Sequence, residues 1–207
     1  MRKNILLILF ILFGLGVSFV SCDDDDNTYY DEAWKLFNDS IYYAAKNNPA
    51  YSEWQSQSFN GSLYYKRYAE NDETSPFSKS FIEIEDQTPL FSDSVVCRYV
   101  GWFIRNNEDK TPYFFDGTEN SVIIDGKEHE LTFNKKQGVG FRVSGVIDGW
   151  ATALQNMKPG DEVRICMPYM LGYGAAGLSN SSTGATMIPG YTTLWFDVKL
   201  LKIIRNK

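Results

Sequence analysis

From residue 90 onward, the chain consists of short runs rich in β-branched and aromatic residues, with one helical pattern among them. Such runs are typical of strands, and they predict strands over residues 94–104, 121–125, 128–134, 139–144, 162–167 and 192–204. The helical pattern is GWATALQNM, residues 149–157, which places Trp150, Leu154 and Met157 on one stripe. Many strands with one short helix predict an α+β domain, a curved antiparallel β-sheet wrapped on that helix.

Turn sequences locate two further features of this domain. In the segment IIDGKEHEL, Asp125 and Gly126 stand between two strand-like runs, which predicts a β-hairpin closed by a type I′ turn. Nearer the N-terminus, Asn60 and Gly61 have turn chemistry and precede SLYYKRYA, a run that predicts another strand.

An amphipathic helix is predicted over residues 30–46, ahead of the strands. Its apolar side chains recur at steps of three and four residues: Tyr30, Trp34, Phe37, Ile41 and Ala45. Asp31 and Glu32 occupy the first turn, where acidic residues are favourable, and Pro49 follows the end of the pattern. The stripe predicts a face that docks onto the main domain rather than one that binds a ligand.

The first residues predict export and lipid attachment. MRKN gives a basic start, and the apolar run from Ile5 to Val20 is short for a bilayer-spanning helix of ~20 residues but suits a signal peptide. The run ends in FVSC, which resembles the bacterial lipobox, where the chain is cut before a cysteine that then carries lipid; here it is Cys22. A plain secretory signal and a membrane anchor are the alternatives. The acidic run Asp23 to Asp26 is typical of a solvated spacer, and after a lipidated cysteine it resembles signals for export to the cell surface.

Charge and reactive residues exclude several classes of function. The net charge of −6 and the lack of a basic stripe argue against a nucleic-acid partner. His129 is the single histidine and falls in the predicted hairpin, where we expect it to be exposed, and no nucleophile elbow accompanies it. The segment GYGAAG, residues 172–177, lacks the Lys-Ser/Thr ending of a phosphate-binding loop.

Two cysteines besides Cys22 lie inside predicted strands. Cys97 and Cys166 lack the spacing of paired metal-binding cysteines, so no metal site is predicted. An oxidising compartment would permit a disulfide between them. We expect instead two buried or half-buried thiols.

Aromatic and aliphatic residues at the ends of predicted strands and loops carry a resemblance to a known family. The densest segments are FRVSGVIDGWATALQNMKPGDEVRICMPYMLGYGAAG, from Phe141, and IPGYTTLWFDVKLL, which ends at Leu201. From about Ser62 to Ile203, the sequence resembles the FKBP-type peptidyl-prolyl cis–trans isomerases. The resemblance implies an FKBP-like domain over residues 59–207, after a lipoprotein signal peptide at 1–21 and a lipid-anchored acidic tether with the N-terminal helix at 22–58.

The resemblance implies one apolar pocket with two groups of residues. The catalytic group would be Tyr99, Asp116, Trp150, Tyr173 and Phe196. The substrate-binding group would be Phe115, Val139, Phe141, Val146, Ile147 and Ile188, with the register between Val139 and Phe141 left open.

Individual roles follow from the same resemblance. Trp150 would form the floor of the pocket, with aromatic and aliphatic walls around it, and Ile188 would close one side. The backbone N–H of Ile147 would hold one carbonyl of a bound peptide, and the hydroxyl of Tyr173 would hold another. Asp116 would lie at the rim, oriented by Tyr99.

Three features near this pocket depart from the family pattern. GYGAAG is followed by LSNSSTGATM, a longer and more polar loop. The stretch between Asp116 and Phe141 carries the inserted β-hairpin, and the usual I-P-P reads Ile188-Pro189-Gly190.

The implied function is a peptidyl-prolyl cis–trans isomerase that acts on proline-containing polypeptides and assists the folding of envelope or surface proteins. It would work by desolvating and twisting the X-Pro amide, without a cofactor. The protein would be anchored in the cell envelope by lipid on Cys22, at the outer membrane. The alternative is a catalytically weak FKBP-like chaperone or peptide-binding lipoprotein. Dimeric relatives use an N-terminal helical extension; because one helix is predicted here, we expect a monomer.

Overall fold

The computed structural model describes residues 25–69, 72–77, 86–106, 108, 110–133 and 137–205, with the backbone alone described for 25–31. The expected signal peptide and the lipidation site Cys22 lie outside these residues. In the described part of the chain, no helix combines the length and apolar character needed to cross a bilayer.

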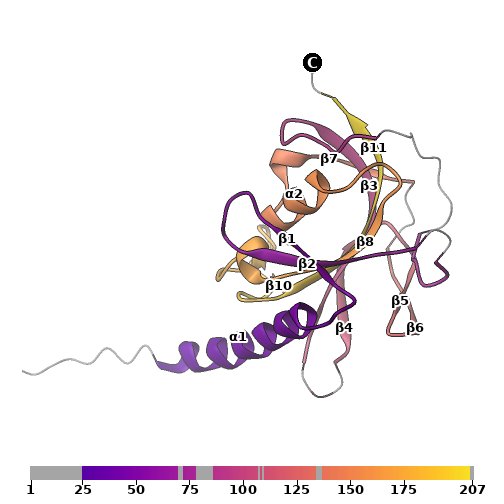
Figure 1. The fold of residues 1–207 in the computed structure, drawn as a ribbon. Helices are drawn as coiled ribbons and strands as arrows, with labels where there is room; N and C mark the ends of the chain where they lie inside the picture. Colours follow the sequence, from indigo (N-terminus) through magenta and orange to yellow (C-terminus); the bar gives the residue numbers. More distant parts are fainter. Residues whose placement is uncertain are drawn as a thin grey trace, which may run out of the picture.

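The main sheet has seven strands, all paired antiparallel (Figure 1). Their order is β1-β2-β8-β11-β3-β4, and β7 also pairs with β3. Their bounds are β1 Ser52–Gln55, β2 Ser62–Arg67, β8 Glu162–Met167, β11 Leu194–Ile204, β3 Ser94–Ile104, β4 Pro112–Gly117 and β7 Val139–Arg142. The sheet therefore begins at Ser52, within the range expected for the tether and N-terminal helix.

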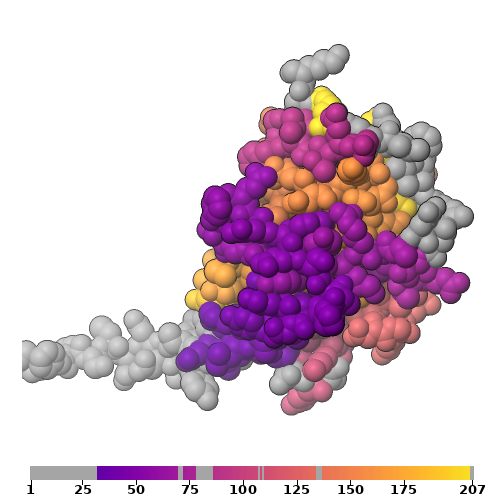
Figure 2. Space-filling model, in the orientation of Figure 1, coloured from indigo at the N-terminus to yellow at the C-terminus, as the bar shows by residue number. Residues whose placement is uncertain are grey.

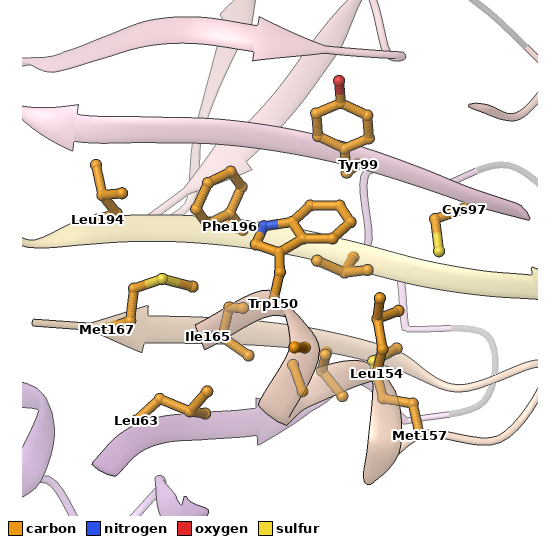
Figure 3. Packing of buried hydrophobic residues seen from close by; sticks show 14 of the residues in the cluster. Leu63, Cys97, Tyr99, Trp150, Leu154, Met157, Ile165, Met167, Leu194 and Phe196 are labelled. Atoms are coloured by element: carbon orange, nitrogen blue, oxygen red, sulfur yellow. The ribbon is translucent and has the colours of Figure 1, made fainter. Parts of the chain in front are cut away.

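The helix α2, Asp148–Gln155, packs inside the curve of this sheet (Figure 1). The core between them is made of buried side chains from α2 and from the strands, several of which Figure 3 shows: Leu63, Cys97, Tyr99, Trp150, Leu154, Met157, Ile165, Met167, Leu194 and Phe196. The predicted α+β fold, a curved antiparallel sheet wrapped on one short helix, is confirmed. Trp150, Leu154 and Met157 are each at most 4% exposed, as their shared stripe predicts.

The predicted hairpin forms a separate two-stranded sheet of β5, Ser121–Ile124, and β6, Lys127–Glu130. Asp125 and Gly126 both have positive φ, 50° and 77°, as a type I′ turn requires. The second strand ends at Glu130, four residues before the predicted end at 134.

Several short elements escape the sequence pattern. The strands β1 and β4 lie at the two edges of the main sheet, where one side needs no partner, so polar residues and Pro112 are tolerated. Two strands of two and three residues, β9 Leu178–Ser179 and β10 Thr186–Ile188, bring the ends of the polar loop together. Short 3-10 helices follow β7 and β8, η1 Val143–Gly145 and η2 Tyr169–Leu171.

The N-terminal helix α1, Asp25–Lys46, begins earlier than predicted, within the acidic run. It docks onto the residues that lead into β11. The indole of Trp34 donates to Thr192 Oγ1 at 3.2 Å, and Asn38 Oδ1 accepts the backbone N–H of Thr193 at 2.8 Å. The predicted docking of this helix onto the main domain is confirmed, and Figure 2 shows the N-terminal segments, in indigo and purple, packed across one face of the molecule.

The two cysteines of the domain are separate thiols. Cys97 lies in β3 and Cys166 in β8, and both are buried and free. Burial raises the pKa of each thiol well above its ordinary value, so both stay protonated. The expectation of two buried thiols is confirmed.

Candidate functional site

A cavity of about 320 Å³ opens beside α2, on the concave side of the sheet. It is lined by Tyr99, Phe115, Asp116, Phe141, Gly145, Val146, Ile147, Trp150, Tyr173 and Phe196. The structure thus brings together every side chain expected in the pocket except Val139 and Ile188. Volumes of ~300–1,000 Å³ are usual for sites that hold small ligands or side chains.

Trp150 rises from the first turn of α2 and forms the floor of this cavity (Figure 3). Its ring is 4% exposed and is surrounded by three other aromatic rings. Tyr99 and Phe196 meet it edge-on, at centroid distances of 5.2 and 5.4 Å, and Phe141 is tilted against it at 5.2 Å. Edge-to-face contacts hold aromatic rings in defined orientations. The floor of the cavity is therefore rigid and apolar.

A glycine that the sequence pattern does not single out lets the opposite wall form. Phe115 in β4 packs edge-on against Phe196 in β11, with the centroids 5.5 Å apart. Gly101 of β3 lies beneath both rings, and a Cβ at this position would be 2.5 Å from Phe196 Cε1 and 2.8 Å from Phe115 Cζ. A glycine inside a strand is the signal that marks such a close approach.

One hydrogen bond joins the wall of the cavity to its rim. The hydroxyl of Tyr99 donates to Asp116 Oδ2 at 2.7 Å, and Asp116 Oδ1 accepts the backbone N–H of Gly117 at 2.8 Å. Burial raises the pKa of Tyr99 above its ordinary range, and the neighbouring carboxylate raises it further. The hydroxyl therefore stays protonated and fixes the side chain of Asp116, which is otherwise exposed.

Two residues that line the cavity carry donors that have no partner in the described part of the chain. The carbonyl of Ile147 accepts from the N–H groups of Trp150 and Ala151, at 2.9 and 3.0 Å, but its own N–H makes no hydrogen bond to a described residue. The hydroxyl of Tyr173 likewise makes none, and burial raises its pKa, so it remains a donor. Both groups are therefore available to donate a hydrogen bond to a ligand.

The turn that carries Ile147 is fastened from a distant part of the chain. Asp148 Oδ1 accepts the hydroxyl of Ser56 at 2.6 Å, and Asp148 Oδ2 accepts that of Ser58. Ser56 is 1% exposed, and both serines lie in the connection between β1 and β2. Nothing in the local sequence around residues 56–58 indicates this contact, because it depends on how β1 joins the sheet.

The structure explains why glycine occupies position 190 in the Ile188-Pro189-Gly190 segment. A Cβ on Gly190 would lie 1.9 Å from the backbone oxygen of Ala175, so this segment and the GYGAAG loop touch through bare backbone. Gly177, with φ +70°, is similarly close to the oxygen of Ile188. The departure from I-P-P therefore accompanies the close packing of these two loops.

Two expected pocket residues lie elsewhere. Ile188 is 1% exposed, packs in the main core and is not among the residues that line the cavity. Val139 pairs with Cys97 at the start of β7, two residues before Phe141, which pairs with Val95 and lines the cavity. The register left open by the sequence is thus decided in favour of Phe141.

The single histidine is not among the residues that line this cavity. In the described ranges, no group of three or more His, Cys, Asp or Glu side chains is arranged to hold a metal ion. His129 is half-buried in β6 rather than exposed as expected, because its ring packs on Phe114 with the centroids 5.6 Å apart. Burial lowers its pKa, and Lys127 lowers it further.

Sequence comparison places this site in a known family. A model of the FKBP-type peptidyl-prolyl cis-trans isomerase matches residues 85–201. The FKBP-type peptidyl-prolyl cis-trans isomerase FkpA of Escherichia coli (strain K12) is 32% identical over 117 residues, 56% of this chain and 33% of that protein. The macrophage infectivity potentiator of Trypanosoma cruzi is 40% identical over 96 residues, 46% of this chain and 44% of that protein. The chain therefore spans less than half the length of these relatives.

Solved structures share the fold. FkpA from Escherichia coli superimposes with a TM-score of 0.54 and 23% identity, covering 86% of this chain and 62% of that chain. A peptidyl-prolyl cis-trans isomerase from Pseudomonas syringae pv. tomato gives a TM-score of 0.52 and 21% identity, covering 84% of this chain and 96% of that chain.

Proposed function

The chain belongs to the FKBP-type peptidyl-prolyl cis–trans isomerase family, and we propose that it isomerises X-Pro bonds of polypeptides in the cavity above Trp150. The observation that carries this proposal is the aromatic floor with two unpartnered donors beside it, from Ile147 and Tyr173. A proline ring needs an apolar surface, and the peptide on either side of it offers carbonyl acceptors. Both requirements meet in this one cavity.

The chemistry asked of the site is modest. Rotation about a peptide bond has a barrier of ~18–20 kcal/mol, and the uncatalysed X-Pro reaction takes tens to hundreds of seconds. A thousandfold acceleration lowers the barrier by about 4 kcal/mol. No proton transfer, metal or covalent intermediate is needed for a change of this size.

The rings and the donors would act on different states of the amide. The planar amide is strongly dipolar because of resonance, and the twisted amide has lost much of this charge separation. An apolar cavity walled by Trp150, Tyr99 and Phe196 therefore disfavours the planar form relative to the twisted one. The N–H of Ile147 and the hydroxyl of Tyr173 would hold carbonyls in the twisted geometry, which is binding that favours the transition state.

The test is an isomerase assay on the full chain with a proline-containing tetrapeptide, together with proline-limited refolding of a protein substrate. We expect catalysis that Trp150→Ala and Asp116→Ala both reduce, and that Trp54→Phe, outside the cavity, leaves unchanged. Circular dichroism shows whether each variant is folded. A folded wild-type chain without catalysis would refute the proposal, and client binding without catalysis would favour the alternative, an FKBP-like chaperone or peptide-binding lipoprotein.

The place of action is proposed from the sequence of the N-terminus. The apolar run followed by Cys22 supports a lipid-anchored protein of the cell envelope that assists the folding of envelope or surface proteins. We further propose a monomer, because α1 folds back onto its own domain through Trp34 and Asn38. Sedimentation of the purified chain tests this state.

A further inference from the structure

A second cavity lies on the other face of the sheet, between α1, the outer faces of β3 and β11, and the β5–β6 hairpin. Its volume is about 360 Å³, and its lining residues are Phe37, Ser40, Ile41, Ala44, Ala45, Asn48, Tyr51, Trp102, Ile104, Lys110, Ile124, Asp125, Arg164 and Trp195. A smaller cavity of about 260 Å³ shares Asn48, Tyr51, Asp125 and Arg164 with it. We call the two together the outer groove. Figure 1 shows α1 and the hairpin on either side of this region.

The outer groove is separated from the isomerase cavity by a single layer of backbone. Trp195 and Phe196 are consecutive in β11, and successive side chains of a strand point to opposite faces. Phe196 lines the isomerase cavity, whereas Trp195 lines the outer groove. The two sites therefore have no side chain in common.

Aromatic rings form the wall of the outer groove. Trp102 of β3 and Trp195 of β11 face each other across the strand pair with an interplanar angle of 11° and centroids 6.4 Å apart. Tyr51 meets Trp195 edge-on at 5.9 Å. Ile41, from α1, and Ile124, from β5, add aliphatic surface on either side. Trp102 is 2% exposed and the guanidinium of Arg164 lies over its ring, 5.1 Å from the centroid, so the ring surface that the groove presents comes mainly from the half-buried Trp195 and Tyr51.

The polar atoms of the wall are mostly donors. Among the described residues, the indole N–H groups of Trp102 and Trp195 and the hydroxyl of Tyr51 make no hydrogen bond. Every fully buried side-chain N or O in these ranges has a partner, so these three donors reach solvent. Burial raises the pKa of Tyr51 to about 12, which keeps its hydroxyl protonated.

Acceptors are fewer than donors in the same place: Lys66 and Lys110 line the outer groove as further donors, and Asp125 is its one lining carboxylate in the part of the chain that the structure describes. Asn48 Oδ1 already accepts the N–H of Ala50 at 2.9 Å. Arg164 is held by Asp197, with N···O distances of 2.8 and 2.9 Å, so its charge is compensated. Asp125 lies at the exposed end of the hairpin. A ligand of this groove must therefore be apolar and rich in acceptors, and it must bring few donors.

We infer that the outer groove binds a proline-rich segment in the polyproline II conformation. Such a segment has no internal hydrogen bonds, so all its carbonyls are free to accept. Its prolines carry no N–H, so no donor is left unpaired against the donor-lined wall. Proline rings pack on flat aromatic faces, which is how aromatic grooves recognise these segments. The inference goes beyond the proposed isomerase function and does not depend on it.

The test measures binding of N-acetyl-octaproline-amide to the full chain by titration calorimetry. Ala44 is an exposed residue of α1 that lines the groove, so Ala44→Trp fills the groove without disturbing the core. Ala33→Trp, at an exposed position of the same helix outside the groove, is the matched control. We expect Ala44→Trp to weaken binding at least about tenfold and Ala33→Trp to change it less than about twofold. Tyr51→Phe, which removes one donor, should weaken binding about threefold.

Three results would overturn the inference. One is equal affinity for an N-acetylated glycine-serine octamer, which shares the free carbonyls but has N–H donors and no rings. Another is octaproline binding that Asp116→Ala removes and Ala44→Trp leaves intact, which would assign the peptide to the isomerase cavity. The third is self-association of the chain that Ala44→Trp abolishes while octaproline does not bind. Isomerase activity is measured on every variant, so failure of the isomerase proposal is recognised separately.

Discussion

Tyr99 and Asp116 lie on neighbouring strands and are joined by a 2.7 Å hydrogen bond from the hydroxyl to the carboxylate. Tyr99 also packs edge-on against Trp150, so this bond ties the rim of the cavity to its floor. The two residues should therefore act as a unit.

The first prediction concerns this unit. Tyr99→Phe keeps the ring but releases Asp116, and Asp116→Ala removes the acceptor, so each should lower kcat/KM about three- to tenfold. Because the effects of substitutions within one hydrogen-bonded network are not additive, the double variant should lose little more activity than either single variant. Isomerase assays on all four proteins measure the coupling. Simple multiplication of the two losses would show that the hydrogen bond has no part in the activity.

A second prediction follows from the raised tyrosine pKa values. Burial raises the pKa of Tyr42, Tyr51, Tyr68 and Tyr99 above the ordinary ~10, so the folded state favours their protonated forms. The contribution of these tyrosines to the free energy of unfolding is fully present below about pH 10. It is lost as the pH rises towards their pKa values in the folded state.

The expected result is a free energy of unfolding that falls steeply above about pH 10, and isomerase activity that is constant between about pH 6 and 9. Urea denaturation at about pH 8, 10 and 11 measures the first. Tyr99→Phe should reduce the slope of the free energy of unfolding against pH by the equivalent of up to one proton. A free energy of unfolding unchanged over this range would contradict the assigned direction of the shifts.

Gly101 gives the third prediction. Gly101→Ala adds a Cβ that must displace both Phe196 and Phe115, so we expect a loss of about 1–3 kcal/mol of stability and a narrower cavity with lower kcat/KM. Gly140→Ala is the control, since a Cβ there would come no closer than 3.9 Å to Val95 O. Equal effects of the two substitutions on denaturation and on activity would remove the special role of Gly101.

The fourth prediction concerns the contact between Asp148 and the two serines. Replacing Ser56 and Ser58 together by alanine releases the turn that presents the N–H of Ile147, so KM should rise about threefold or more with a smaller change in kcat. Ser52→Ala, an exposed position of β1, is the control. If only thermal stability falls while KM stays constant, the contact is structural and does not position the substrate.

The fifth prediction tests the lipid anchor. Cys22→Ser should abolish incorporation of labelled fatty acid, because it removes the thiol to which the lipid would be attached. Its isomerase activity in solution should be unchanged. Fatty-acid labelling that persists in Cys22→Ser would place the attachment at another residue.

The sequence allowed prediction of the long elements and of most of the cavity lining. The contacts of Trp150 with Tyr99 and Phe196 could be predicted for two reasons. Each residue lies on an element with a clear hydrophobic period, and the family resemblance indicates which elements are neighbours. Val139 and Phe141 share one face of a strand, so alternation alone does not separate them. The structure separates the two residues: Phe141 pairs with Val95 and lines the cavity, whereas Val139 pairs with Cys97 and is not among the lining residues.

Contacts between distant segments were beyond the sequence pattern. Ser56 reaches Asp148 because a short, polar edge strand joins the sheet, and such strands have no strong alternation. Ile188 was expected in the pocket from its place in the family motif, but it is buried in the main core, two residues before the close contact of Gly190 with Ala175. Local patterns record neither event.

The fastening of α1 to Thr192 and Thr193 determines where a mechanical load would arrive. These residues directly precede β11, whose third residue is Phe196. A chain held at its N-terminal end and pulled by a client would transmit that tension along the helix to the strand bearing a wall of the cavity. The same hydrogen bonds fix the axis of α1 relative to β11, so the direction in which the cavity opens follows the orientation of this helix.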